Sequence, residues 1–377
     1  MTPSVASATI VHMSELPFLH LQGSPYRQGV QHGRQLKRQI AHNIELYRSR
    51  MITAGLAESE LAERAQRYLG LFTREDSLYR AIMDGIADGS GQQLLDIALL
   101  NARYELLYSA WSEFGRPSLD SIRSECTAFG GNSDAFTDGG VQMGQNWDWF
   151  TGVEGALLQW KSGETTVIGF TEAGVAGAKV GINSNGIGLC VNGLGASVDD
   201  WRIDSVPFHL RTWRILQSTT MQQAVGHATA PRPACSANFF IGSASRGVAT
   251  IETSPLSSRV IYQDGTQPLV HANHFREPKA LGVYESWLQS GRVSTYHRCE
   301  RMETLLHKET PISAERLHAA MRDHDGGPIA ICRHPVETDP EELRTHTALA
   351  VHLELAEGRM HYTWGPPCES EFATVAL

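Results

Sequence analysis

The period of the hydrophobic residues changes about a third of the way along this chain of 377 residues. Before Cys126, apolar residues recur at helical spacing, most clearly between Leu94 and Leu107. After Cys126, short runs rich in Val, Ile, Thr and aromatic residues alternate with Gly, Asn and Asp turns, which is the pattern of strands. A helical first part and a strand-rich second part with segregated helix pairs predict an α+β fold built in layers.

The expected elements follow from these periods and from local capping signals. Ser24 and Pro25 open the first helix, and Thr73 with Asp76 resembles a capping box. The predicted helices cover about 25–50, 58–69, 73–87, 94–107, 207–218, 220–229, 295–306 and 313–323. The predicted strands cover 141–147, 165–170, 187–191, 239–241, 248–252, 259–262, 269–272, 349–355 and 360–364. Residues 116–124 are polar, contain Pro117 and are expected to form an exposed linker.

Composition limits the classes of partner. The chain has 32 Lys and Arg against 41 Asp and Glu, with no basic tract, so we expect neither nucleic acid nor an anionic membrane as a partner. No apolar run approaches the roughly 20 residues of a membrane span. The six cysteines are widely spaced without a Cys-x-x-Cys pair, which favours a reduced cytoplasm and indicates no metal site. His271 and His274 could ligate a metal, but no third ligand suggests itself.

Cys126 is the strongest candidate for a catalytic residue. It follows the polar linker and begins a predicted strand. Asp148 comes after a turn, close enough in sequence to lie beside Cys126 across a hairpin. A single cysteine is more often buried and inert, as we expect for Cys190 and Cys332 in their apolar runs. Asp148 could equally be an ordinary turn residue. The context nevertheless favours Cys126 as a nucleophile with Asp148 as its partner.

A cysteine at a new N-terminus would carry its own base. The thiolate is the nucleophile, and a free cysteine has a pKa of about 8.5. A free α-amine has a pKa of about 7.7–8.0, so the amine of the same residue can take the thiol proton. Before cleavage this nitrogen is an amide, but the thiol can still attack the carbonyl of Glu125. We therefore expect self-cleavage between Glu125 and Cys126, giving a helical segment of residues 1–125 and a catalytic part of residues 126–377.

Several short motifs occur in an order that resembles a known family. They cover nearly the whole chain, and as an ordered set they are far more specific than any one of them. The sequence resembles the penicillin acyltransferase-like family of autoproteolytic cysteine N-terminal-nucleophile hydrolases. The motifs that carry the resemblance are Leu21–Pro25 with His32-Gly33, Gly85–Ala87, Leu100–Arg103, Cys126-Thr127, Gln145–Asp148, Thr171–Gly174, Gly181–Gly186, His271–His274 and Ile331–Arg333.

The resemblance implies a four-layer αββα sandwich and roles for particular residues. It makes Cys126 the nucleophile and Asp148 the partner of its amine. It makes Asn273 a side-chain donor to the oxyanion and the Asn192 region a weaker candidate for a backbone donor. Arg333 corresponds to a buried arginine of the active site. One departure is Glu125, because the fungal member has Gly before its cysteine.

The expected activity is cleavage or transfer of the acyl group of small N-acyl amides through a Cys126 thioester. The alternatives are a pure hydrolase of the bile-salt or penicillin V acylase type and a non-catalytic binding protein on the same scaffold. No cofactor is implied, although acyl-coenzyme A could serve as acyl donor. The two cleaved fragments should stay associated with each other. Trp147, Trp149 and Phe150 could be core residues or could wall a pocket. As a pocket, they favour aryl-acetyl or medium-chain acyl groups.

Overall fold

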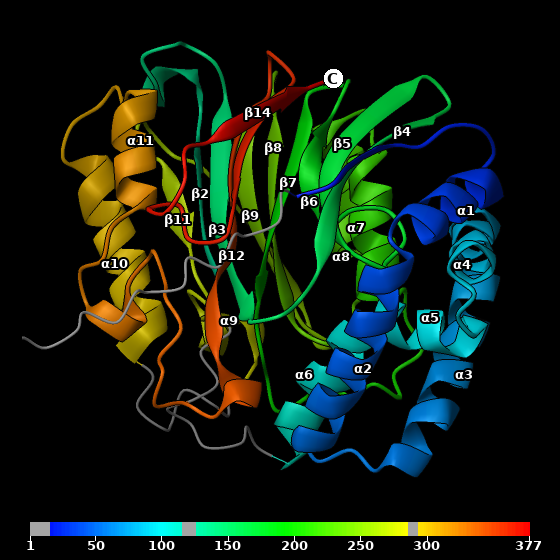
Figure 1. The fold of residues 1–377 in the computed structure, drawn as a ribbon. Coiled ribbons are helices and arrows are strands. Elements are labelled where there is room, and N and C mark those ends of the chain that lie inside the picture. The colour runs from blue at the N-terminus through cyan, green and yellow to red at the C-terminus, as the bar shows by residue number, and fades with distance from the viewer. Residues whose placement is uncertain (1–15, 115–125, 286–292) are drawn as a thin grey trace, which may run out of the picture.

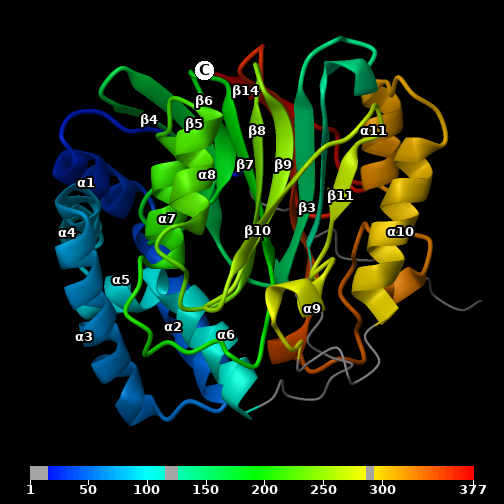
Figure 2. The same cartoon turned by 180° about the vertical axis from the view of Figure 1, so that it is seen from behind.

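Two β-sheets stacked face to face form the centre of the molecule, and helices cover the outer face of each sheet (Figure 1). The computed structural model describes residues 16–114, 126–285 and 293–377. Helices α10 and α11 lie outside the six-stranded sheet, and helices α7 and α8 lie outside the eight-stranded sheet (Figures 1 and 2). The expected αββα sandwich is therefore confirmed, with the N-terminal helices packed at its α7 side.

The helices fall into an N-terminal group and two pairs that flank the sheets. The first group is α1 (Pro25–Gln35), α2 (Lys37–Thr53), α3 (Glu58–Glu75), α4 (Ser77–Ser90), α5 (Leu94–Asn101) and α6 (Arg103–Phe114). The others are α7 (Phe208–Leu216), α8 (Met221–Thr229), α9 (Pro278–Leu281), α10 (Val293–His307) and α11 (Ala314–Met321). Short 3₁₀ turns are η1 (Ser133–Ala135), η3 (Gly327–Ile329) and η4 (Glu341–Leu343). Every helix in these described ranges is too short or too polar to cross a lipid bilayer.

The strands are antiparallel to their neighbours except for β1, which pairs parallel with β4. The eight-stranded sheet has the order β1 (Phe18–His20), β4 (Gly155–Ser162), β5 (Thr165–Glu172), β6 (Val180–Asn183), β7 (Ile187–Gly193), β8 (Ala237–Ser243), β9 (Gly247–Thr253) and β10 (Ser258–Tyr262). The six-stranded sheet has the order β11 (Leu269–His271), β2 (Cys126–Gly131), β3 (Gln142–Phe150), β12 (Thr345–Glu354), β13 (Arg359–Trp364) and β14 (Ala373–Ala376).

The N-terminal helices differ from the sequence prediction at their ends. The helix expected over 25–50 is two helices separated at Leu36, and the apolar run 94–107 is divided at Ala102. The predicted capping box at Thr73 is wrong. Thr73 donates to the carbonyl of Leu69 within α3, and Asp76 itself caps α4 by accepting from the backbone N–H of Leu78 (3.0 Å).

Helices α1 and α4 approach so closely that only glycine fits between them. A Cβ on Gly29 would lie 2.1 Å from the carbonyl oxygen of Ile82, and a Cβ on Gly85 would lie 2.1 Å from that of Tyr26. Gly91 then ends α4 with a φ of +73°, in the left-handed region that favours glycine. These glycines allow the first and fourth helices to form one compact block beside the sheets.

Strand β2 places Cys126 at the beginning of an inner strand of the six-stranded sheet. It lies between β11 and β3, and its register pairs Cys126 with Trp147 and Thr127 with Asn146. Its inner face packs against β7 of the other sheet. The expected linker 116–124 and the scissile residue Glu125 lie outside the described residues.

Candidate active site

Cys126 is buried, with 5% of its surface exposed, and its backbone is held by groups from three other elements. Its N–H donates to Oδ1 of Asn273 at 2.6 Å. Its carbonyl oxygen accepts from Nη1 of Arg298 at 2.7 Å and from Nδ2 of Asn192 at 3.3 Å. The residue that the sequence singled out as nucleophile therefore lies among polar side chains that fix both sides of its peptide backbone.

Asn273 lies just after β11 and is fixed by hydrogen bonds from both its backbone and its side chain. Its N–H donates to Oγ1 of Thr295 (2.7 Å), and its Nδ2 donates to the carbonyl of Gly193 (2.9 Å). Its Oδ1 accepts from Cys126 and from Nη2 of Arg298 (3.1 Å). The amide is thus oriented with its oxygen toward the Cys126 nitrogen and its donor toward the pocket wall at Gly193.

Arg298 is a site residue that the sequence analysis missed. It is fully buried on α10, and its Nη1 also donates to Oγ1 of Thr127 at 2.7 Å. A charge of this kind needs full hydrogen bonding when it is buried. The available signal was its place in the predicted helix, since it shares the buried face of α10 with Thr295, Cys299, Met302 and Leu306.

Asn192 contacts Cys126 through its side chain, whereas a backbone donor was expected from this region. The backbone of Asn192 is in register with Asn238 in the β7–β8 ladder. Its Oδ1 accepts from Nδ2 of Asn238 (2.9 Å), whose own Oδ1 accepts from Thr250 (2.7 Å). A chain of amides and a hydroxyl from the second sheet therefore orients the Nδ2 donor toward the Cys126 carbonyl.

Asp148 and Arg333 form a second polar pair close to Cys126. The carboxylate Oδ2 of Asp148 lies 3.6 Å from Nε of Arg333, and its Oδ1 accepts from Thr347 at 2.7 Å. Nη2 of Arg333 donates to Oγ of Ser294 (3.0 Å), which also accepts from Nε of Arg298 (3.3 Å). Ser294 therefore connects the two buried arginines, and the sequence-predicted Asp148 and Arg333 belong to the same network as Cys126 and Asn273.

The Cys126 thiol is protonated in this intact chain at neutral pH. Burial raises its pKa to about 11, and the negative charge of Asp148 adds to the rise, although Arg298 and Lys179 oppose it. The thiol needs a base to become a nucleophile.

The pocket beside Cys126 is lined mainly by aromatic side chains. Cys126 and its register partner Trp147 point to the same face of the sheet, as does Trp149 two residues on. The free volume is only about 20 Å³, roughly what one water molecule needs. Its walls are completed by Arg103, Tyr104, Tyr108, Lys179, Val191, Gly193 and Phe208. Phe150 does not line this pocket and instead packs on Trp149 and under Arg50.

A buried carboxylate, Glu172, binds the two cations at the back of this pocket. It is paired with Arg103 and Lys179 and also accepts from the hydroxyl of Tyr47. Burial alone would raise the pKa of Glu172, but Arg103 and Lys179 outweigh it and hold the pKa at about 2. Burial lowers the pKa of Lys179 to about 7, and its Nζ lies 3.2 Å from the centre of the Trp147 ring.

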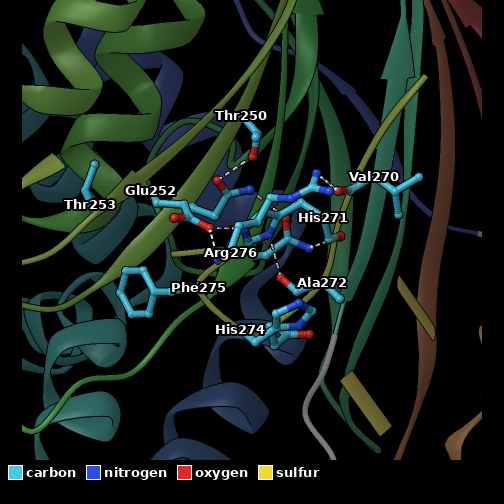
Figure 3. A network of polar contacts seen from close by, with 12 residues as sticks. Thr250, Glu252, Thr253, Val270, His271, Ala272, His274, Phe275 and Arg276 are labelled. Carbon is cyan, nitrogen blue, oxygen red and sulfur yellow. Dashed lines mark hydrogen bonds and ion pairs between the residues drawn. The ribbon is translucent and has the colours of Figure 1, made fainter. Parts of the chain in front are cut away.

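His271 takes part in a hydrogen-bond network rather than in a metal site with His274. Its Nε2 lies 2.9 Å from Oε1 of the buried Glu252, and its Nδ1 lies 2.7 Å from the carbonyl oxygen of Ala272 (Figure 3). The backbone N–H of Arg276 donates to the same Glu252 oxygen at 2.7 Å. Both ring nitrogens of His271 therefore already lie within hydrogen-bond distance of a protein oxygen.

Comparison with known sequences identifies the class of protein. A sequence model described as acyl-coenzyme A:6-aminopenicillanic acid acyl-transferase matches residues 135–369, and the chain belongs to this family. The matched range begins after Cys126. A relative from Emericella nidulans, the acyl-coenzyme A:6-aminopenicillanic-acid-acyltransferase 40 kDa form, is 29% identical over 324 residues, covering 83% of this chain and 83% of the relative.

Similar solved structures include acylases and bile acid hydrolases. A mutant of conjugated bile acid hydrolase from Clostridium perfringens has a TM-score of 0.45 and 13% identity, covering 67% of this chain and 92% of the other. Penicillin V acylase from Agrobacterium tumefaciens has a TM-score of 0.42 and 16% identity, covering 63% of this chain and 83% of the other. The family assignment rests on the sequence match.

Proposed function

We propose that this protein is a self-processing cysteine amidohydrolase or acyltransferase that acts on small N-acyl amides. The Cys126 thiol attacks the acyl carbonyl, and its own α-amine takes the thiol proton and passes it to the leaving amine. The C–N bond breaks as the S–acyl bond forms, and water or a second amine then takes the acyl group. Asn273 and neighbouring donors bind the oxyanion of each tetrahedral intermediate.

The observation that carries this proposal is the environment of the Cys126 nitrogen and carbonyl. The nitrogen is 2.6 Å from Oδ1 of Asn273, and the carbonyl is bound by Arg298 and Asn192. If the bond before Cys126 is cut, an acceptor already lies in place for the new amine. The family match supports acyl transfer from an amide or thioester as the class of reaction.

We place the cut between Glu125 and Cys126, which makes residues 1–125 and 126–377 two subunits. The reaction needs no cofactor, and acyl-coenzyme A is a candidate acyl donor because the Emericella relative carries it in its name. All six cysteines are free, which supports a reducing compartment such as the cytoplasm.

The first test is the number of chains in the purified protein. Wild-type protein should give fragments of about 14 and 28 kDa, taking roughly 110 Da per residue, because the thiol attacks the preceding carbonyl. The Cys126→Ala variant should remain intact at 41.5 kDa. Denaturing mass spectrometry and N-terminal sequencing of the larger fragment measure both.

Two results would contradict this assignment. An active wild-type protein that stays intact after long incubation would exclude self-cleavage, and with it the α-amine as base. A fragment that begins at any residue other than Cys126 would exclude this nucleophile. An intact and inactive protein would instead favour a binding protein on the same scaffold.

We propose an apolar acyl group, aryl-acetyl or medium-chain, because aromatic side chains form most of the wall beside Cys126. Each methylene that becomes buried contributes about 0.8 kcal/mol, so kcat/KM should rise with acyl length until the pocket is full. A series of acyl p-nitroanilides and acyl-coenzyme A esters measures this dependence. A flat profile, or preference for a charged acyl group, would contradict it. Partition of the acyl group between water and an added amine separates hydrolase from transferase.

A further inference from the structure

We propose that His324, Cys332, His334 and Cys368 form a structural zinc site, separate from the pocket at Cys126. One ligand atom from each residue lies within 4.8 Å of the other three. Two thiolates and two imidazoles are a ligand set that selects Zn²⁺ in tetrahedral geometry. The sequence analysis predicted no metal site, because the chain has no Cys-x-x-Cys pair, and Cys368 lies well after the other three residues in sequence.

The distances fit a single ion between the four side chains. Zn–S bonds of about 2.3 Å and Zn–N bonds of about 2.0–2.1 Å imply ligand–ligand separations of roughly 3.3–3.8 Å in a tetrahedron. Nε2 of His334 lies 3.2 Å from Nε2 of His324, 3.2 Å from Sγ of Cys368 and 4.0 Å from Sγ of Cys332. Only small side-chain movements are needed to reach bonding geometry.

Hydrogen bonding alone does not account for this convergence. Nε2 of a histidine has either one N–H or one lone pair, so it can satisfy one neighbour well. Here three potential ligand atoms surround the same nitrogen of His334. A shared cation would satisfy all of them at once, with Cys332 and Cys368 binding as thiolates and their protons passing to solvent.

The other nitrogen of His334 already has the partner that metal-binding histidines usually have. Its Nδ1 lies 3.2 Å from Oε1 of Glu369. A carboxylate at this position fixes the tautomer in which Nε2 is free to ligate, and it strengthens the imidazole as a ligand. This contact is a second, independent sign of a metal-binding arrangement.

The backbone around the four ligands is also held in place. Arg322, two residues before His324, donates through Nε to the carbonyl of Pro367 at 2.8 Å, beside Cys368. The N–H of Cys332 donates to the carbonyl of Asp323 at 3.0 Å. The end of α11, the segment 330–335 and the loop before β14 are therefore already joined without the ion.

The proposed site is adjacent to the catalytic network. Arg333 lies in sequence between the ligands Cys332 and His334, and its Nε is 3.6 Å from Asp148. A bound ion would fix the short segment that carries Arg333. We therefore assign the zinc a structural role that supports the position of this arginine.

The test is metal analysis of the full-length chain without an affinity tag. The protein is expressed with added zinc and purified under reducing conditions without chelator. We expect one zinc per chain by inductively coupled plasma mass spectrometry, and a lower melting temperature after chelation. The Cys368→Ser and His334→Ala variants should lose the zinc, and Cys368 is exposed, so its replacement should leave the fold intact.

Matched controls keep this test independent of the proposed function. Cys299→Ser and His20→Ala lie outside the cluster and should keep the zinc. Cys126→Ala should also keep it, whether or not the wild-type chain is processed. Cobalt substitution should give thiolate-to-metal absorption in wild type and not in Cys368→Ser. Failure of the reduced wild type to bind zinc or cobalt, retention of zinc by both ligand variants, or a Cys332–Cys368 disulfide in the freshly purified protein would overturn the proposal.

Discussion

At the scale of single residues, Asn273 is the side chain whose amide oxygen and amide nitrogen are both hydrogen-bonded within the site. Its oxygen accepts from Cys126 and Arg298, while its Nδ2 donates to the carbonyl of Gly193 in the pocket wall. Nδ2 carries two hydrogens, so it can donate one to the Gly193 carbonyl and the other to a substrate oxygen. The bonds that the amide oxygen accepts fix the direction of both donors.

The first residue-scale prediction concerns Asn273→Ala. Loss of one oxyanion donor should reduce kcat about 10²–10³-fold. Steady-state kinetics on the best acyl amide measures the loss, and circular dichroism checks the fold. Near wild-type turnover in a folded variant would show that Asn273 does not bind the oxyanion.

The second prediction concerns Arg298→Lys. Lysine keeps the charge but loses the planar fork that reaches Cys126, Thr127 and Asn273 together, so processing before Cys126 should slow markedly. The fraction of cleaved chain against time, read by denaturing mass spectrometry, measures the rate. Arg359→Lys, at an exposed position on β13, is the matched control and should process normally. Equal cleavage rates in the two variants would show that Arg298 does not contribute to processing.

The sequence predicted the candidate site only in part, for physical reasons. Cys126, Asp148, Asn273 and Arg333 are brought together, and each lies in a motif that carried the family resemblance. Arg298 is bound by backbone and side-chain atoms that are distant in sequence, so only its place on an apolar helix face could have marked it. The four residues of the proposed zinc site have no diagnostic spacing beyond Cys332-x-His334.

At the scale of elements, α6 and α7 close the pocket at Cys126. Tyr104 and Tyr108 come from α6, and Phe208 comes from α7. Tyr108 lies so close to β7 that a Cβ on Gly193 would be 1.6 Å from its hydroxyl oxygen. The aromatic face of α6 therefore occupies space that an acyl chain would need.

The element-scale prediction is that Tyr108→Ala enlarges the acyl pocket. Removal of the ring should allow longer acyl chains, with kcat/KM gaining roughly fourfold for each further methylene that becomes buried. The acyl p-nitroanilide series measures the change in chain-length preference. Tyr108→Phe removes only the hydroxyl and should change this preference little. An unchanged length profile in Tyr108→Ala would place the acyl site elsewhere.

Most strands rich in β-branched and aromatic residues were predicted well, whereas β1, β4, β6 and β14 were missed. Most strands after Cys126 were expected within a few residues of their ends. Strands β1, β6 and β14 have three or four residues, too few to show alternation. Strand β4 begins with four consecutive buried residues, which hides its period of two. The helix breaks at Leu36 and Ala102 were missed because neither position carries a Gly or Pro that would signal a break.

At the scale of the whole molecule, Glu172 joins the two parts that the proposed cut would separate. Tyr47 and Arg103 lie before the cut, whereas Glu172 and Lys179 lie after it. All of these groups are buried. Removing one partner from such a buried cluster of charges strongly destabilises the fold, because the remaining charges are left buried without a counter-ion.

The whole-molecule prediction therefore concerns Glu172→Gln in the uncleavable Cys126→Ala chain. Removing the carboxylate should lower the free energy of unfolding at neutral pH by about 3–5 kcal/mol, because Arg103 and Lys179 stay buried. Since the folded pKa of Glu172 is lowered from 4.5 to about 2, its stabilisation is present above 4.5 and is lost as pH falls toward 2. The Gln variant should lack this part of the acid dependence, about 3 kcal/mol.

Urea titrations across this pH range measure both effects. The exposed Glu357→Gln variant is the control and should follow the parent chain. Equal stability of the Glu172→Gln and Glu357→Gln chains at neutral pH would show that the buried network does not hold the two parts together.

The inner position of β2 has a consequence for the lifetime of a processed enzyme. If the chain is cut before Cys126, a new terminus is held between β11 and β3 instead of fraying at an edge. Once such a protein unfolds, two separate polypeptides must find one another before β2 can regain its place. Its working life would then be set by how slowly it unfolds and not by an equilibrium between folded and unfolded forms. A processed molecule that is lost by unfolding would then be replaced mainly by synthesis of a new chain.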